Sequence, residues 1–331
     1  MTDMTAHPLE TIPDGEAEMI EHVAQVQIGI MKDRQNPKKR GQHPKHQALV
    51  RGRFEVSQAV PKAMRVGVFA QPRSFEAVVR ISTGPMPRDC DPNPHAMAVK
   101  LIDVPGSPCG TQDFIMLDQP TFFIRDVAEY VKFFDVARSD PGATAYFKSC
   151  PYEFGLNLTF NVVIGSHLER QYWSEVPVAM GDGAARLTLI PHPDNVSGRA
   201  PATTADGLRD ALEEHFIKNR KPARFAVAAQ AFIDQSTTPI EDATAVWPSP
   251  FEIVATLTIP AQDFMAPGQY GFGEALSYTP WHCHPDHRPL GGIQRCRKRV
   301  YEESQKLRHS LTKTENREPT KTDCDGLGRM F

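Results

Sequence analysis

The segment FEAVVRIST, residues 75–83, is the clearest strand in the sequence and decides the prediction of the fold. Apolar and β-branched residues dominate it, and Arg80 and Ser82 stand two positions apart, so on a strand both side chains point to the same face. Seven further segments have strand-like patterns: 51–58, 95–104, 113–117, 176–180, 185–191, 223–233 and 251–260. Eight strands in two groups of four, with few helices between them, predict an eight-stranded antiparallel barrel.

Helical patterns lie near both ends of the chain and between the strands. Apolar residues of segment 14–33 recur at helical spacing, and the basic sequence NPKKR follows. Further helices are predicted at 126–138, 142–149, 204–219 and 291–309. The sequence therefore predicts an α+β protein in three parts: an N-terminal arm with a helix (1–38), one barrel domain (39–310) and a loosely ordered tail (311–331).

The composition argues against several classes of protein. The 331 residues carry a formal net charge of −3, which gives no general reason to expect nucleic acid or an anionic membrane as a partner. No transmembrane helix is expected, because no run of about 18 apolar residues exists, and the acidic N-terminus lacks the apolar core of a secretory signal. Six cysteines without a CxxC pair predict reduced thiols in the cytoplasm. The sequence HCH at 282–284 is interpreted as a loop, because adjacent side chains point in different directions.

The segment RKRVYEESQKLRH, residues 297–309, sets one tyrosine among cations. On a helix, Arg297 and Arg308 both fall within roughly 40° of Tyr301, so the three side chains share one face. One interpretation is a charged surface helix with Tyr301 at its edge. The other is a phenol held as phenolate, which near pH 7 requires about 4 kcal/mol, because the ordinary pKa of tyrosine is about 10. A close arginine or an iron(III) ion supplies stabilisation of that kind.

Two further stretches complete a pattern. The sequence RGQHPKHQALV (40–50) contains R-x-x-H, and DFIMLDQPTFFIRD (113–126) ends in an aromatic pair followed by Arg-Asp. Together these motifs resemble the haem catalase superfamily: QPTFFIRD is similar to its PVFFIRD element, VVRIST to its RFST strand, HAMAVKL to its GFAVKF strand, and the tyrosine segment to its R-x3-Y-x6-R helix. The resemblance extends from about residue 38 to 309. It implies the compact, barrel-only branch, because the extra C-terminal helical region of the family is missing.

The resemblance implies haem b as cofactor and gives each site residue a role. Tyr301 corresponds to the axial ligand of the iron, with Arg297 donating a hydrogen bond to its oxygen. Arg40, Arg80 and Arg308 correspond to the arginines that bind the haem propionates.

Three other residues take roles from the same resemblance. His43 corresponds to the distal acid and base, Ser82 would orient the second nitrogen of its ring, and Tyr130 would pack on the porphyrin. Read as isolated residues, His43 is a surface histidine, Arg80 a strand arginine at the barrel rim and Tyr130 an ordinary packed tyrosine. His46 replaces His43 if the alignment shifts.

The sequence departs from the family at the position of its catalytic asparagine, which is Leu117 here. Leucine cannot donate a hydrogen bond to peroxide, so Asp118 or Gln119 would have to reach into the site. This change favours a peroxidase, or an enzyme acting on organic hydroperoxides, over an efficient catalase.

A second tyrosine competes for the axial position. Tyr278 lies in SYTPWHCHPDH, but Glu274 precedes it by four residues and Pro285 follows it by seven, where the motif requires arginines. Tyr301 is therefore the preferred ligand.

These observations predict a haem b-dependent peroxidase that uses a peroxide and a small organic electron donor, with weak catalase activity. One alternative is an isomerase or lyase of fatty-acid hydroperoxides, which needs a long apolar channel and no added reductant. Another is a catalase-like haem-binding or apo binding protein without turnover. By analogy with the family, a homo-oligomer is expected, with residues 1–38 available for self-association.

Overall fold

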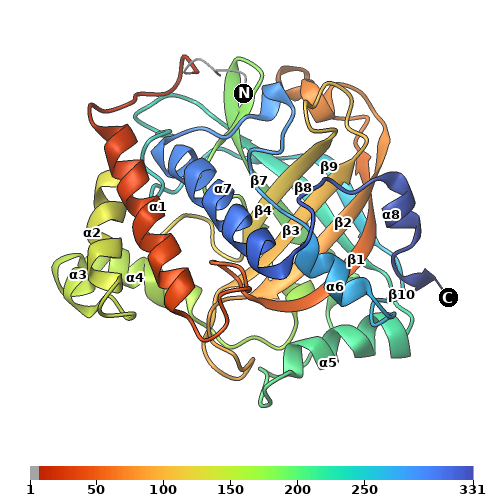
Figure 1. The fold of residues 1–331 in the computed structure, drawn as a ribbon. Helices are drawn as coiled ribbons and strands as arrows, with labels where there is room; N and C mark the ends of the chain where they lie inside the picture. Colours follow the sequence, from red (N-terminus) through yellow and green to blue (C-terminus); the bar gives the residue numbers. More distant parts are fainter. Residues whose placement is uncertain (1–6, 331) are drawn as a thin grey trace.

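The computed structural model of the protein describes residues 7–330, and its centre is a closed antiparallel barrel (Figure 1). Hydrogen bonds join the strands in the order β5-β4-β3-β2-β1-β9-β8-β7, and β5 also pairs with β7, so the ring closes through eight strands. These strands are β1 (Lys45–Val56), β2 (Ser74–Thr83), β3 (His95–Ile102), β4 (Thr111–Leu117), β5 (Tyr172–Trp173), β7 (Gly183–Pro191), β8 (Ala223–Ala231) and β9 (Phe251–Ile259). The predicted α+β class and eight-stranded antiparallel barrel are confirmed.

Successive side chains of each strand point alternately into the barrel interior and to its outer face. Val79 and Ile81 of β2, Met97 of β3 and Met116 of β4 belong to one core cluster that fills the interior. Each fully buried side chain of this size contributes about 1.5–3 kcal/mol to folding. Residues one position away, such as Ala98, point to the outer face, where helices and loops cover them.

Eight α-helices surround the barrel among the described residues: α1 (Glu16–Asp33), α2 (Val127–Ala137), α3 (Thr144–Ser149), α4 (Pro151–Phe160), α5 (Gly207–Glu213), α6 (Gln269–Ala275), α7 (Gly292–Thr312) and α8 (Lys321–Asp325). Short 3₁₀ turns lie at Lys62–Met64, Gly67–Phe69, His167–Glu169, Pro193–Asn195 and Pro285–His287, and a π turn at Glu214–Lys218. Strand β6 (Val178–Met180), at the predicted strand 176–180, pairs antiparallel with β7 outside the ring of eight, in which β5 takes its place. Strand β10 (Gln262–Asp263) pairs with β11 (Arg329–Met330). Over residues 7–330, no helix is both long and apolar enough to cross a membrane.

The N-terminal arm packs on its own barrel domain. Helices α1 and α7 lie side by side (Figure 1) and share an apolar cluster that includes Val23 and Val300. Arg295 of α7 donates to both oxygens of Glu16, at 2.7 and 2.8 Å, which fixes the relative position of the two helices. Residues 1–6 of the arm lie outside the described part, and its role in self-association stays a prediction.

The tail, which the sequence predicted to be loosely ordered, contains one short helix in the structure. Helix α7 continues to Thr312, and α8 begins with a capping box between Thr320 and Asp323. Cys324 and Leu327 are buried against the outer face of the barrel. These two apolar side chains anchor a mostly polar stretch to the barrel.

Other elements also differ from the predicted ones. Strand β1 starts at Lys45 rather than at residue 51, because it pairs with β2 along its whole length. The helix predicted at 204–219 is α5, which passes into a π turn. The short elements β5, α4 and α6 were not predicted from the sequence. Contacts with neighbouring elements hold them in place rather than a local sequence pattern.

Candidate functional site

A small cavity lies between the outer face of β2–β4 and helix α7, and we call it the polar cavity. Its volume is about 90 Å³. Six of the nine predicted site residues line it: Arg40, His43, Arg80, Ser82, Tyr301 and Arg308. These residues come from segment 40–43, strand β2 and helix α7, so folding brings together motifs that are up to 268 positions apart in the sequence.

A larger cavity of about 390 Å³ adjoins the polar cavity, and we call it the aromatic cavity. The two cavities share His43, Tyr301 and four other wall residues. Its apolar walls are formed by Leu117, Ile115, Val300 and seven aromatic side chains from segment 122–160: Phe122, Phe123, Tyr130, Phe133, Phe134, Phe147 and Phe160. The cavities together make a slot with cations at one end and aromatic rings at the other.

Tyr301 stands where the two cavities meet, and Arg297 lines the aromatic cavity one helical turn before it. Burial raises the pKa of the Tyr301 phenol, and the charge of Arg297 opposes this shift. The phenol is therefore neutral near pH 7 in the protein alone. Nη2 of Arg297 donates to Oε2 of Glu175 at 3.0 Å, whereas Nη1 is buried and has no hydrogen-bond partner.

Glu175 is a residue of this site that the sequence analysis missed. It is fully buried, its φ of 60° lies in the left-handed region, and Oε1 has no partner. Burial raises the pKa of Glu175 to about 8, although Arg297 lowers it. A non-glycine residue in this strained conformation is held by its surroundings. The only indication in the sequence was a charged residue inside the otherwise apolar run 172–180.

His43 faces both cavities and has the character of a neutral base. Burial and the charge of Arg80 lower the pKa of His43 to about 3, so its ring is uncharged near pH 7. Its φ of 46° is again left-handed, and its carbonyl oxygen accepts a hydrogen bond from Arg80 Nη2 at 3.1 Å. Nδ1 is buried without a partner. Ser82 lines the same cavity but does not make the expected hydrogen bond to this nitrogen.

Asp118, for which the sequence predicted a catalytic role, lines neither cavity. Its carboxylate accepts from the backbone N–H of His95 at 3.1 Å and contacts the ring Nδ1 of His95 at 2.9 Å and Nε of Arg170 at 3.5 Å. Strand alternation explains the difference: Leu117 points outward into the aromatic cavity, and Asp118 points toward the barrel interior.

Three arginines form the polar end of the slot. Nη2 of Arg40 donates to the carbonyls of Gly273 and Leu276, at 3.0 and 2.6 Å. Nη2 of Arg308 also donates to the Leu276 carbonyl, at 3.1 Å. Burial lowers the pKa of both Arg80 and Arg308 to about 9, and the positive charge of Arg40 contributes to each shift. Nε of Arg80 is buried with no partner.

The remaining candidates, Tyr130, Tyr278 and His46, lie in three different surroundings. Tyr130 lines the aromatic cavity and meets the ring of Phe122 edge to face, at 5.6 Å between centroids. Tyr278 lines the polar cavity, but its hydroxyl is 3.4 Å from the Val78 carbonyl, which accepts its hydrogen bond. His46 lies outside both cavities and stacks on Tyr270 at 4.7 Å.

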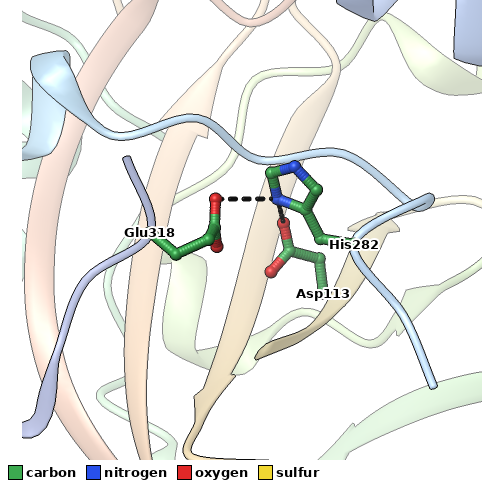
Figure 2. Close-up of side chains that lie close together, drawn as sticks. All are labelled: Asp113, His282 and Glu318. Carbon is green, nitrogen blue, oxygen red and sulfur yellow. Dashed lines mark ion pairs between the residues drawn. The ribbon is translucent and has the colours of Figure 1, made fainter. Parts of the chain in front are cut away.

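A group of metal-ligand types lies elsewhere, on the outer face under the tail. Figure 2 shows Asp113, His282 and Glu318 converging, with His282 Nδ1 at 3.0 Å from Oε1 of Glu318. The ammonium of Lys100 lies 2.7 Å from Oδ1 of Asp113 and also binds Glu318. The carboxylates raise the pKa of His282 to about 9, against the effect of burial. Lys100 thus already supplies the positive charge that a metal ion would bring to these carboxylates. Of the HCH sequence, only His282 takes part in this group.

Solved structures of known proteins share the fold described above. Neither a protein-family model nor a characterised relative matches the chain by sequence. The barrel with its covering helices is the catalase-like fold. A bacterial catalase is similar at 16% identity with a TM-score of 0.64, covering 93% of this chain, and a fungal catalase at 15% with 0.63, covering 85%. Catalase A from Saccharomyces cerevisiae is similar at 13% identity, with a TM-score of 0.61 and 94% of this chain covered.

These similarities establish the fold alone. The chain spans 64% of the bacterial catalase, 61% of the fungal catalase and 70% of the yeast catalase. The activity of the protein has to be argued from its own site.

Proposed function

We propose that the protein is a haem b-dependent peroxidase of the compact catalase-like group, acting on peroxides with a small organic electron donor. One observation carries the proposal: a phenol, Tyr301, and a neutral imidazole, His43, line the same slot, whose far end holds three arginines. This combination suits a flat, apolar ligand with carboxylates on one edge.

The charges at the polar end fit such a ligand. Arg40, Arg80 and Arg308 carry three positive charges. The carboxylate of Glu274 contacts two of them, Arg40 and Arg80, whereas Arg308 donates to the backbone carbonyl of Glu274. Because Lys39 also pairs with Glu274, these cations outnumber the carboxylate, and the two propionates of haem would offset part of the excess positive charge. They would also give Nε of Arg80 the acceptor that it lacks in the protein alone.

The residues around Tyr301 fit as well. Tyr301 would hold the iron through its oxygen, and the unpartnered Nη1 of Arg297 is available to donate to that oxygen. Glu175 fixes the guanidinium through Nη2, so the free Nη1 keeps its orientation. Haem, when bound, supplies an iron(III) centre at which the O–O bond of a peroxide breaks.

His43 would move the proton in this reaction. Its ring is neutral near pH 7, so it can accept a proton from one peroxide oxygen and deliver it to the other. Because Ser82 does not fix the ring, Nδ1 of His43 retains a free hydrogen-bonding position inside the cavity.

The walls of the slot favour organic hydroperoxides over hydrogen peroxide. Leu117 offers no hydrogen bond where the family has asparagine, and Asp118 does not reach the slot. The walls of the aromatic cavity are mainly apolar, which suits the organic group of a hydroperoxide better than the polar hydrogen peroxide molecule. The same apolar walls also support a second candidate, an isomerase or lyase of fatty-acid hydroperoxides, because an acyl chain needs an apolar lining.

Peroxide consumption by the haem-loaded protein tests the proposal. We would compare hydrogen peroxide with cumene hydroperoxide, each with and without guaiacol as electron donor. Faster, donor-dependent consumption of cumene hydroperoxide supports the peroxidase. Conversion of a fatty-acid hydroperoxide without a donor supports the isomerase or lyase. No consumption of any peroxide leaves a haem-binding protein and refutes both enzymes.

A further inference from the structure

One carboxylate, that of Glu274 at the end of α6, lies among four nitrogen-bearing side chains. Its Oε1 is 3.0 Å from Nη1 of Arg40, 3.3 Å from Nδ1 of His46 and 3.6 Å from Nη2 of Arg80. Its Oε2 is 3.0 Å from Nζ of Lys39. Only about a fifth of the Glu274 side chain is exposed, so these charges are largely withdrawn from water.

The fold holds this carboxylate in place. A Cβ atom at Gly273 would lie 2.5 Å from Cε1 of His46, so only glycine lets α6 approach β1 this closely. Nε2 of Gln269, at the start of the same helix, donates to the Leu49 carbonyl at 2.7 Å. Glu274 therefore sits on a short helix docked to the barrel at both ends, beside the arginines.

The charge of Glu274 is permanent under ordinary conditions. Burial raises the pKa of Glu274, but the close His46 ring and the charges of Arg40 and Arg80 outweigh this effect and hold the pKa well below its usual range. Without Glu274, the buried guanidinium groups of Arg40 and Arg80 would face each other with no counter-ion among these contacts.

We propose that Glu274 sets how tightly the polar cavity binds an anionic ligand. It neutralises part of the arginine charge in the ligand-free protein, and the same negative charge weakens the attraction of those arginines for the propionates of haem. The choice of haem as ligand rests on the proposed function, whereas the opposition to anions follows from the ion pairs alone. A unit charge about 10 Å from a ligand charge, at an effective dielectric constant of about 20, changes a binding constant roughly tenfold.

The test is a hemin titration of the ligand-free protein, followed by the Soret band, for wild type and Glu274→Gln. Glu252→Gln is the matched control, because Glu252 is exposed on β9. We expect Glu274→Gln to bind hemin about tenfold more tightly than wild type and control, and to melt at a lower temperature without ligand. Equal or weaker hemin binding would overturn the proposal, because Glu274 would then only position the arginines.

A second probe separates this proposal from the haem function. Inorganic phosphate should raise the melting temperature of Glu274→Gln more than that of wild type, whether or not hemin binds. If no variant binds hemin but this difference is found, the haem function fails and the role of Glu274 stands. An equal effect of phosphate on both proteins refutes the role of Glu274.

Glu274→Asp covers the case in which Glu274→Gln does not fold. Aspartate keeps a counter-ion but withdraws it from the arginines by one methylene group. The hemin affinity of Glu274→Asp must then exceed that of wild type, and an unchanged or lower affinity overturns the proposal.

Discussion

Replacing His43 with glutamine should reduce the acid sensitivity of the fold. The unfolded chain protonates this histidine below about pH 6.5, whereas the folded protein does so only near pH 3. The unfolded state therefore binds more protons between these values, and the free energy of unfolding falls as the pH falls. The slope is about 1.36 kcal/mol for each pH unit, so acidification from pH 6.5 to 5.0 removes about 2 kcal/mol.

Glutamine does not titrate, so His43→Gln lacks this contribution in both states. Urea unfolding at pH 7.5 and pH 5.0 measures the free energy lost by each protein on acidification. We expect the loss in His43→Gln to be about 2 kcal/mol smaller than in wild type. If the two proteins lose the same free energy, His43 is not a buried neutral imidazole, and its assignment as the base is wrong.

His287→Gln is the matched control for this experiment. His287 is buried, burial lowers its pKa to about 4, and it lines neither cavity. The control should therefore show a similar gain in acid resistance. Only His43→Gln should also abolish peroxide consumption by the haem-loaded protein, since only His43 faces the slot.

Two further predictions concern other parts of the molecule. Leu117→Asn should raise the rate of hydrogen peroxide dismutation relative to cumene hydroperoxide consumption by tenfold or more, because asparagine supplies a hydrogen-bond donor on the outward face of β4. Oxygen evolution measures the dismutation. An unchanged ratio of the two rates would contradict the account of substrate choice. Glu318→Gln should loosen the tail, since a hydrogen bond between two charged groups contributes about 1.5–3 kcal/mol and Lys100 would lose one such partner. Faster amide hydrogen exchange in α8, with the barrel strands unchanged, is the expected result, and unchanged exchange in α8 would show that Cys324 and Leu327 hold the tail alone.

The barrel could be predicted from the sequence because its strands carry their own local pattern. Arg80 and Ser82 alternate with apolar residues, and both reach the polar cavity as the spacing predicted. The face of β4 could not be predicted in the same way, because Ile115 and Leu117 on the outer face are as apolar as Met116 in the interior. Whether Asp118 reaches the slot could not be predicted for this reason.

Long-range ion pairs account for the other omissions. Glu175 meets Arg297 across 122 positions, and Glu274 meets Arg40 across 234. No local pattern in the sequence indicates such partners. Helix α8 was not predicted because it depends on buried tertiary contacts, although the capping box that starts it at Thr320 is a local pattern.

The most direct test of the central claim is the visible spectrum of the protein purified after expression with haem supplied, for wild type, Tyr301→Phe and Tyr278→Phe. Both tyrosines line the polar cavity, so each variant is the control for the other. The account predicts a ferric high-spin tyrosinate spectrum in wild type and Tyr278→Phe that is lost in Tyr301→Phe. Loss only in Tyr278→Phe, or no Soret band in any of the three proteins, would contradict it.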